Sequence, residues 1–435
     1  MPAKASDAAP TARKGGPKHA LRASLLLSLG SVVTFCALFE IVVRIVSPDL
    51  SLPQAAPHFR FTQGFEFELP HHQRDAALGW RLKPGTYGRM RINADGFRGA
   101  DFSRTHAAGT RRIAHLGDSC TMGFTVADDD AVYGARVAAL LSKHGVPTET
   151  LNFGVDGYSS HQGRILLDRV LEYAPEYVTL YFGYNDHHYS NASDRDVSYS
   201  NPPFRRILEQ SDAYRFMRRH VLRLARREAR LAEPHRRVDL EAYDENIRAM
   251  VARIRARGAI PILVTTPLRP YAPLFENEVL SEVDGRQQWI TQDFWVSQEL
   301  QKRGVRLEDA AGTRQLQDVL ELGLRQHPEW PYLHFLQARE FQSAAKPEEA
   351  RAALARAAQY DEERRVMEGY GERTRALAAE LDVELVDLAR TFAAQRRLLF
   401  NDVVHPNVEG HRLIADQLVQ TVLRLESPDA SFGEP

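Results

Sequence analysis

The chain has 435 residues, of which 43% are hydrophobic and 26% are charged, so it is long enough for one large domain or two smaller ones. Its formal net charge is −1, which gives no indication of a nucleic-acid partner. The two cysteines, Cys36 and Cys120, lie in an apolar run and beside a serine, so we expect no structural disulfide.

The N-terminal segment predicts a membrane anchor. Residues 1–22 form a basic tail that we expect to be cytoplasmic, and residues 23–46 form an apolar run long enough for a transmembrane helix. This order predicts a single pass through a bacterial inner membrane, with the catalytic domain facing the periplasm or the exterior. Glu40 and Arg44 interrupt the run, but they are four residues apart and can pair on one helix face. A cleaved signal peptide is the alternative, and it would also export the chain.

Beyond the anchor, the sequence alternates between strand and helix patterns. Two segments interrupt this alternation, residues 187–239 and roughly 272–368. We expect a linker and a small β-rich extension over residues 47–110, followed by a catalytic domain made of residues 111–271 and 370–425. A helical insertion is expected over 272–369 and a disordered tail over 426–435. Repeated strand–helix units predict an α/β fold: a three-layer sandwich with a mostly parallel sheet flanked by helices.

The predicted elements of the catalytic domain alternate between strand and helix along the chain. The strands are an apolar run that starts at 111 and ends in the turn at Ser119, then 148–153, 177–182, 259–264 and 384–387. The helices are 131–144, 162–173, 240–257, 372–381 and the segment after His405.

The helical insertion has the pattern of a tetratricopeptide repeat of about 34 residues. Small and large apolar residues recur at the spacing of its two helices, at Ala338, Phe341, Ala350, Leu354 and Ala357. Residues 315–328 resemble the second helix of a preceding repeat. Because one repeat cannot bury its own face, we expect the insertion to pack on the core domain or on a protein partner.

Three residues predict a nucleophilic mechanism. Ser119 lies in the tripeptide Gly117-Asp118-Ser119, and Asp402 and His405 follow far along the chain. A serine hydroxyl is a weak nucleophile unless a base accepts its proton. A histidine can be that base, and a carboxylate can fix its tautomer and stabilise its positive charge.

Polar motifs follow the predicted strands at the edge where open α/β sheets place their sites. The chain resembles the SGNH (GDSL-type) hydrolase family in four blocks: 117–119, Gly157, 183–186 and 402–407. The resemblance implies a flavodoxin-like sheet and a serine esterase that needs no cofactor. It implies Ser119 as nucleophile, His405 as base and Asp402 as the acid that orients His405. It also implies an oxyanion hole made by the backbone N–H groups of Ser119 and Gly157 and by the side-chain amide of Asn185.

Other interpretations of these residues stay open at this stage. Gly157 could be a turn glycine, with Gly154 as the rival donor, and Asn185 could cap a helix. Asp118 could be a second catalytic acid, but we expect its side chain to accept hydrogen bonds from the backbone of its own loop.

Histidine pairs raise the question of a metal. They occur at His71-His72, at His187-His188 and at His405 with His411, but no spacing matches a known zinc site, so we expect none. An Arg-rich helix at 217–237 could contact anionic lipid or acidic glycan, but a solvated face with an apolar stripe is the favoured interpretation.

These observations favour an exported esterase that hydrolyses ester-linked acyl groups on a small molecule, lipid or glycan of the cell envelope. An acyltransferase is a second hypothesis, because the same acyl-enzyme can react with a sugar hydroxyl instead of water. A third hypothesis is a non-catalytic scaffold whose insertion recruits an envelope protein.

Overall fold

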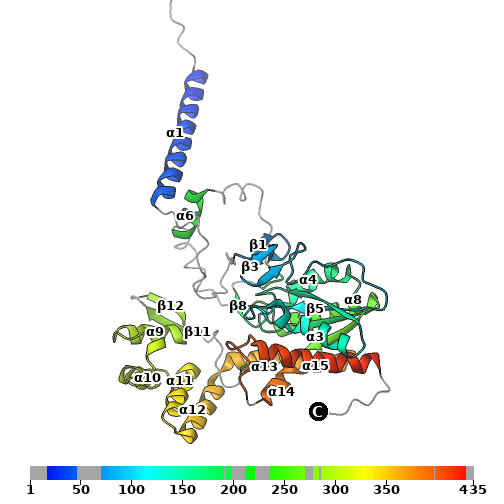
Figure 1. Ribbon diagram of the computed structural model, residues 1–435. Helices are drawn as coiled ribbons and strands as arrows, with labels where there is room; N and C mark the ends of the chain where they lie inside the picture. Colours follow the sequence, from blue (N-terminus) through cyan, green and yellow to red (C-terminus); the bar gives the residue numbers. More distant parts are fainter. Residues whose placement is uncertain are drawn as a thin grey trace, which may run out of the picture. The chain divides into compact units, whose positions relative to one another are not determined.

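The computed structural model describes residues 17–46, 70–190, 193–196, 211–220, 235–269, 278–283, 286–395 and 397–427 (Figure 1). It divides into two compact units, Met1–Pro57 with Ser200–Ala232, and His58–Tyr199 with Glu233–Pro435. The predictions for residues 1–16, for the linker from 47 to 69, for residues 428–435 and for most of the Arg-rich segment fall outside the described residues. Residues 17–22, which were predicted to belong to the basic tail, are the start of the first helix.

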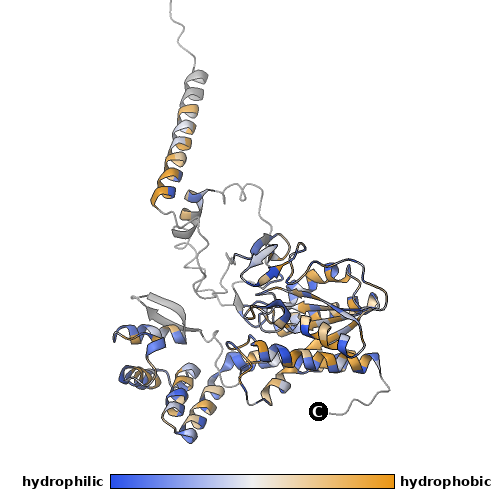
Figure 2. Ribbon diagram, viewed as in Figure 1, coloured by the Kyte–Doolittle hydropathy of each residue, from blue (hydrophilic) through white to orange (hydrophobic). Residues whose placement is uncertain are grey.

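The first unit contains helix α1 (Pro17–Val46) and the short helix α6 (Asp212–His220). Within α1, Leu26–Val46 is long and apolar enough to cross a membrane, a property that a signal sequence shares, and Figure 2 shows its hydrophobic character. Glu40 and Arg44 form the predicted pair, with Arg44 Nε 2.9 Å from the Glu40 carboxylate. Glu40 also accepts hydrogen bonds from the backbone N–H groups of Asp212 and Ala213, each 2.9 Å long, and so binds the N-terminus of α6.

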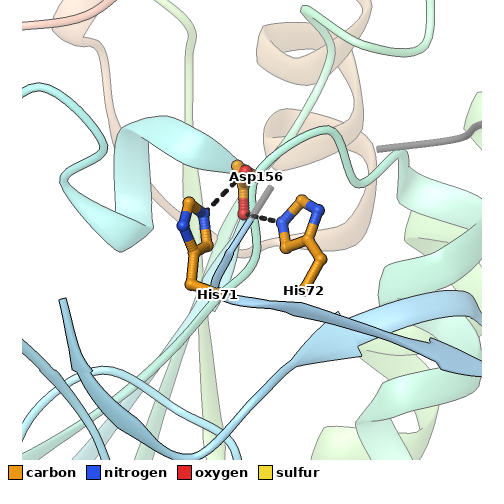
Figure 3. Close-up of side chains that lie close together, drawn as sticks. All are labelled: His71, His72 and Asp156. Atoms are coloured by element: carbon orange, nitrogen blue, oxygen red, sulfur yellow. Dashed lines mark hydrogen bonds and ion pairs between the residues drawn. The ribbon is translucent and has the colours of Figure 1, made fainter. Parts of the chain in front are cut away.

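The second unit begins with the predicted β-rich extension, which forms two hairpins. Strands β1 (His72–Asp75) and β2 (Gly79–Leu82) make the first, and β3 (Gly85–Tyr87) and β4 (Met90–Ile92) make the second. The first hairpin contacts the turn at 155–159: the Trp80 indole N–H donates to the Asp156 carbonyl at 3.0 Å. His71 and His72 face the carboxylate of the same aspartate (Figure 3).

The predicted parallel sheet is present and has five strands. They are β5 (Arg111–Gly117), β6 (Thr148–Gly154), β7 (Tyr177–Tyr181), β10 (Ile260–Val264) and β13 (Glu384–Val386). Their order across the sheet is β13-β10-β7-β5-β6, and all neighbours run parallel. In chain order this is a 2-1-3-4-5 arrangement, which confirms the predicted flavodoxin-like α/β fold.

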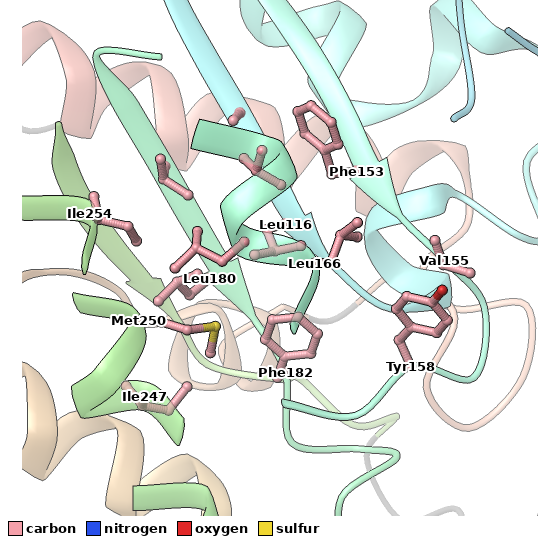
Figure 4. Close-up of a cluster of buried hydrophobic side chains, with 14 of the residues drawn as sticks. Leu116, Phe153, Val155, Tyr158, Leu166, Leu180, Phe182, Ile247, Met250 and Ile254 are labelled. Carbon is pink, nitrogen blue, oxygen red and sulfur yellow. The ribbon is translucent and has the colours of Figure 1, made fainter. Parts of the chain in front are cut away.

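Helices cover both faces of the sheet, as the strand–helix pattern predicted. Side chains of α4 (Ser160–Leu171), α8 (Leu240–Ala256) and α13 (Glu362–Leu381) join the core on one face. Figure 4 shows Leu166 of α4 and Met250 of α8 within it. Side chains of α3 (Tyr133–Lys143), α14 (Leu388–Ala393) and α15 (Val408–Glu426) join the core on the other. Buried side chains such as Leu180 and Phe182 each stabilise the fold by about 1.5–3 kcal/mol through loss of water contact.

The insertion contains the predicted helices, α10 (Arg314–Gln326), α11 (Pro331–Ser343) and α12 (Pro347–Tyr360), preceded by α9 (Gln292–Gln301). The small residues that predicted close helix packing, Ala338, Ala350 and Ala357, are all buried. The assignment as a tetratricopeptide repeat stays a prediction.

Two features of this region differ from the sequence-based expectation. An antiparallel hairpin, β11 (Glu278–Val283) with β12 (Arg286–Thr291), precedes the helices. Helix α13 starts at Glu362, ten residues before the predicted start at 372, and so crosses the expected boundary at 369. It is continuous because Met367, Tyr370 and Leu377 form one buried stripe along it.

A buried histidine makes the stability of the second unit depend on pH. Burial lowers the pKa of His411 to about 3, from an ordinary value of 6.5, and its Nδ1 accepts the backbone N–H of Tyr133 at 3.2 Å. Between these two values the unfolded chain binds a proton that the folded chain does not bind. This group therefore lowers the free energy of unfolding as the pH falls.

We expect the His411→Asn substitution to remove this dependence while keeping an acceptor for Tyr133. Below about pH 6, wild type should lose about 1.4 kcal/mol of unfolding free energy for each pH unit through this histidine, and the variant should not. The difference between variant and wild type should therefore grow by that amount for each pH unit. Chemical denaturation from about pH 7 to about pH 5 measures the difference. The control His144→Asn changes an exposed histidine, so its unfolding free energy should vary with pH as that of wild type does. The same pH dependence in His411→Asn as in wild type would contradict the prediction.

Candidate active site

Ser119 lies in a tight turn between the first strand of the sheet and a one-turn helix, α2 (Ser119–Met122). Strand β5 ends at Gly117, where a Cβ atom would lie 2.7 Å from the Tyr181 carbonyl oxygen, so only glycine fits. Asp118 caps the helix by accepting the Cys120 N–H at 2.8 Å. This confirms that Asp118 bonds its own loop, and the close packing fixes Ser119 at the carboxyl edge of the sheet.

Asp402 and His405 lie in a loop that ends just before α15. The Asp402 carboxylate accepts the backbone N–H groups of Val404 at 3.0 Å and His405 at 2.8 Å, so one side chain shapes the loop. The Asn401 side chain donates to Thr125 Oγ1 at 2.9 Å, which joins this loop to the segment after α2. The loop is thus held against the Ser119 turn, although His405 and Ser119 are 286 residues apart in the sequence.

The structure brings Ser119, His405 and Asp402 into one hydrogen-bonded chain. His405 Nε2 lies 2.8 Å from Ser119 Oγ, and His405 Nδ1 lies 2.6 Å from Asp402 Oδ2. Burial alone would raise the pKa of Asp402, but hydrogen bonds from His405 and the loop backbone outweigh it and lower the pKa below its ordinary value. An ionised carboxylate can only accept, so Nδ1 carries the proton and Nε2 is left to accept from the serine hydroxyl.

Asn185 follows strand β7 and is connected to the serine turn by a buried hydrogen bond. Its Nδ2 donates to Asp118 Oδ2 at 3.2 Å and to the Tyr158 carbonyl at 3.1 Å. No helix begins at Asn185 within the described part of the chain, so the alternative of a helix cap is wrong. Burial raises the pKa of Asp118 to about 6, although its hydrogen bonds and the nearby His405 oppose the rise.

The two candidate glycines have different surroundings. The Gly154 N–H already donates to Asn152 Oδ1 at 2.9 Å, so it is not available to an oxyanion. A Cβ atom at Gly154 would meet the backbone of Met122, so the glycine is needed for close packing. Gly157 has φ +78° and its carbonyl accepts from Arg237 Nη1 at 2.8 Å. Among the described residues, neither the N–H of Gly157 nor that of Ser119 donates to a protein acceptor.

Sequence reasoning missed the buried ion pair that holds Gly157. Arg237 is fully buried and donates Nη2 to the Asp194 carboxylate at 2.8 Å and to Gln162 Oε1 at 3.0 Å. Ser159 Oγ donates to the same carboxylate at 2.6 Å. The pair therefore fixes both sides of the turn that carries Gly157. No local spacing in the sequence indicates it, because Arg237 is the last residue of the predicted Arg-rich helix and Asp194 lies in a loop. The end of that predicted helix is instead a short strand, β9 (His235–Arg236).

Of the three histidine pairs that raised the question of a metal, the structure directs both histidines of one pair, His71 and His72, at the same carboxylate. Within the described residues, His71, His72 and Asp156 form the single cluster with ligand atoms close enough to share an ion. His405 instead binds Ser119 and Asp402, and His411 lies under α3.

The buried ion pair makes a prediction about stability. Arg237→Met should lower the free energy of unfolding by about 3–5 kcal/mol, because it leaves the buried Asp194 carboxylate without its cation. The matched control is Arg195→Met, which removes an exposed partner of Glu245 and should cost about 0–1 kcal/mol. Denaturant titration of both variants tests the prediction, and equal losses would contradict it.

The comparisons with known proteins agree with this geometry at the level of the family. Residues 115–292, which include Ser119, Gly157 and Asn185, match the GDSL-like Lipase/Acylhydrolase family. The matched range ends before Asp402 and His405. No curated protein matched the sequence.

Several solved structures are similar over most of their length but at low identity. A GDSL-like lipase from Bacteroides thetaiotaomicron is 12% identical, with a TM-score of 0.34, over 72% of this chain and 89% of that chain. The acetyl xylan esterase AlAXEase is 14% identical, with a TM-score of 0.36, over 72% and 99%. A lipase/acylhydrolase from Enterococcus faecalis is 14% identical, with a TM-score of 0.33, over 72% and 95%. At these TM-scores the assignment rests on the sequence match: the chain carries a GDSL-like lipase/acylhydrolase domain and is a hydrolase that acts on ester bonds.

Proposed function

We propose that the protein is a serine esterase in which Ser119 is the nucleophile, His405 the general base and Asp402 the group that orients His405. The observation that carries the proposal is the position of the His405 imidazole, 2.8 Å from the serine hydroxyl and 2.6 Å from the carboxylate. These are the distances that proton transfer from serine to histidine needs.

The proposed reaction has two halves. Ser119 Oγ attacks the ester carbonyl carbon while His405 Nε2 takes the hydroxyl proton, and Asp402 stabilises the imidazolium. The tetrahedral intermediate expels the alcohol, which takes the proton from His405, and leaves an acyl group on Ser119. Water then attacks this acyl-enzyme, gives its proton to His405 and releases the carboxylic acid as the proton returns to Ser119.

We propose that the oxyanion of each intermediate is stabilised by the N–H groups of Ser119 and Gly157 and by the Asn185 amide. In favour of this are the absence of a protein acceptor for either N–H group in the described part of the chain and the burial of Asn185. Donors that are already held in place stabilise a developing charge without a cost of reorganisation. The Arg237 contact with the Gly157 carbonyl supplies that rigidity on one side of the turn.

We further propose that α1 is a retained anchor rather than a removed signal peptide, and that the domain acts outside the inner membrane on acylated lipids or glycans of the envelope. In favour of retention, Glu40 accepts from Ser211 Oγ at 2.6 Å as well as from the N-terminus of α6. The rings of Phe39 and Phe216 also pack edge to face, with their centroids 6.1 Å apart. Cleavage after α1 would remove the partner of α6.

The nucleophile is tested by Ser119→Ala in the full chain. We expect the variant to lose ester hydrolysis and labelling by a fluorophosphonate, because both need the serine oxygen. p-Nitrophenyl esters of increasing acyl length, with and without a glycan acceptor, measure hydrolysis and reveal any transfer to sugar. The control Ser142→Ala changes an exposed serine and should behave as wild type. Full turnover by Ser119→Ala would overturn the assignment.

The oxyanion role is tested separately by Asn185→Ala. Loss of one such donor lowers kcat by about 10²–10³-fold with little change in KM, since the donor acts on the transition state. Steady-state kinetics and the melting temperature of the same sample separate this effect from unfolding. If a folded Asn185→Ala protein kept the wild-type kcat, the side chain would have no part in the oxyanion hole.

A further inference from the structure

Two histidines and one aspartate form a buried cluster outside the Ser119 site. His71 and His72 lie at the start of the first hairpin, and Asp156 lies in the turn between β6 and α4, 84 residues further along. Figure 3 shows both imidazole rings directed at the one carboxylate. Neighbouring residues of a strand normally point to opposite faces, and both rings meet Asp156 because His71 lies just before β1.

The distances within the cluster are close to those of a metal site. His72 Nε2 lies 2.8 Å from Asp156 Oδ1, His71 Nε2 lies 3.4 Å from Asp156 Oδ2, and the three ligand atoms all lie within 4.8 Å of one another. Two ligands on a tetrahedral Zn²⁺ are separated by about 3.4 Å, given metal–ligand bonds of about 2.0–2.2 Å.

The charge of the cluster also calls for a cation. The Asp156 side chain is 6% exposed and the His72 side chain is 1% exposed, so the carboxylate has lost most of its water. In the region that the structure describes, no arginine or lysine pairs with Asp156, and the two imidazoles are its side-chain partners. A buried carboxylate without a positive charge is costly. Either a protonated imidazole or a metal ion bound by the neutral imidazoles can supply that charge to Asp156.

We propose that His71, His72 and Asp156 bind one divalent transition-metal ion of the Zn²⁺ type. Two imidazole nitrogens and one carboxylate oxygen are donors that suit Zn²⁺, whereas Mg²⁺ and Ca²⁺ prefer oxygen alone. Three protein ligands leave a fourth position for water. The ion joins the hairpin to the turn that carries Gly157, so its primary role is structural.

The test uses the full chain without a polyhistidine tag, stripped with a chelator and then given Co²⁺ or Zn²⁺. We expect about one metal ion per chain by elemental analysis and visible d–d absorption from Co²⁺ of low coordination number. Zn²⁺ should raise the melting temperature of wild type, since an ion that binds only the folded state stabilises it.

Variants distinguish binding of the ion at the cluster from binding at exposed histidines. His72→Gln and Asp156→Asn should lose the Co²⁺ absorption and the Zn²⁺-dependent rise in melting temperature, whereas His144→Gln, at an exposed histidine, should keep both. Wild type that binds far less than one ion, or cluster variants that bind as wild type does, would overturn the proposal. If a cluster variant fails to fold, the wild-type absorption and stoichiometry still decide. These readouts do not depend on esterase activity, so they stand apart from the Ser119 test.

Discussion

The parallel register of the central sheet is the constraint on which the site depends. Gly117 pairs with both Gly154 and Tyr181, and Tyr181 pairs with Val264, so four neighbouring strands end level at one edge. Each following loop therefore opens at the same edge, which is how residues from distant parts of the chain reach Ser119. The strands are buried on both faces, and a slip of one residue would turn each side chain to the opposite face. The hydrophobic cores thus fix the positions of the polar loops.

Buried polar contacts then hold those loops in one conformation. Arg237 fixes the carbonyl of Gly157 from one side, and Trp80 fixes that of Asp156 from the other. A complete set of such contacts adds little net stability, because the groups lose water on burial, although removing one partner of a buried ion pair is costly. Their effect is on precision, since a donor that must move to meet an oxyanion stabilises it less. The turn is therefore rigid because two separate parts of the chain, the first hairpin and the segment at Arg237, both bind it.

The sequence predicted those parts of the fold that short patterns specify. The five strands and the flavodoxin-like order followed from alternating strand and helix patterns, and the turn at Ser119 followed from three adjacent residues. Arg237 with Asp194, and Asp156 with His71 and His72, were not predictable in this way. Their partners lie 43 to 85 residues apart and become neighbours only when the loops fold. The early start of α13 was missed for a related reason, because its buried stripe faces a tertiary partner.

The contact between Asn185 and Asp118 links the protonation state of Asp118 to the proposed role of Asn185 as a donor to the oxyanion. Both acceptors of the Asn185 amide, the ionised Asp118 carboxylate and the Tyr158 carbonyl, can only receive hydrogen bonds, so the amide nitrogen must face them. An oxyanion near this amide would compete with ionised Asp118 for the same N–H. The pKa of Asp118 lies near 6 because of its burial, and a second negative charge nearby would raise it further. Uptake of a proton by Asp118 would weaken its hold on the amide as the oxyanion forms, so the raised pKa and the donor role of Asn185 are physically compatible.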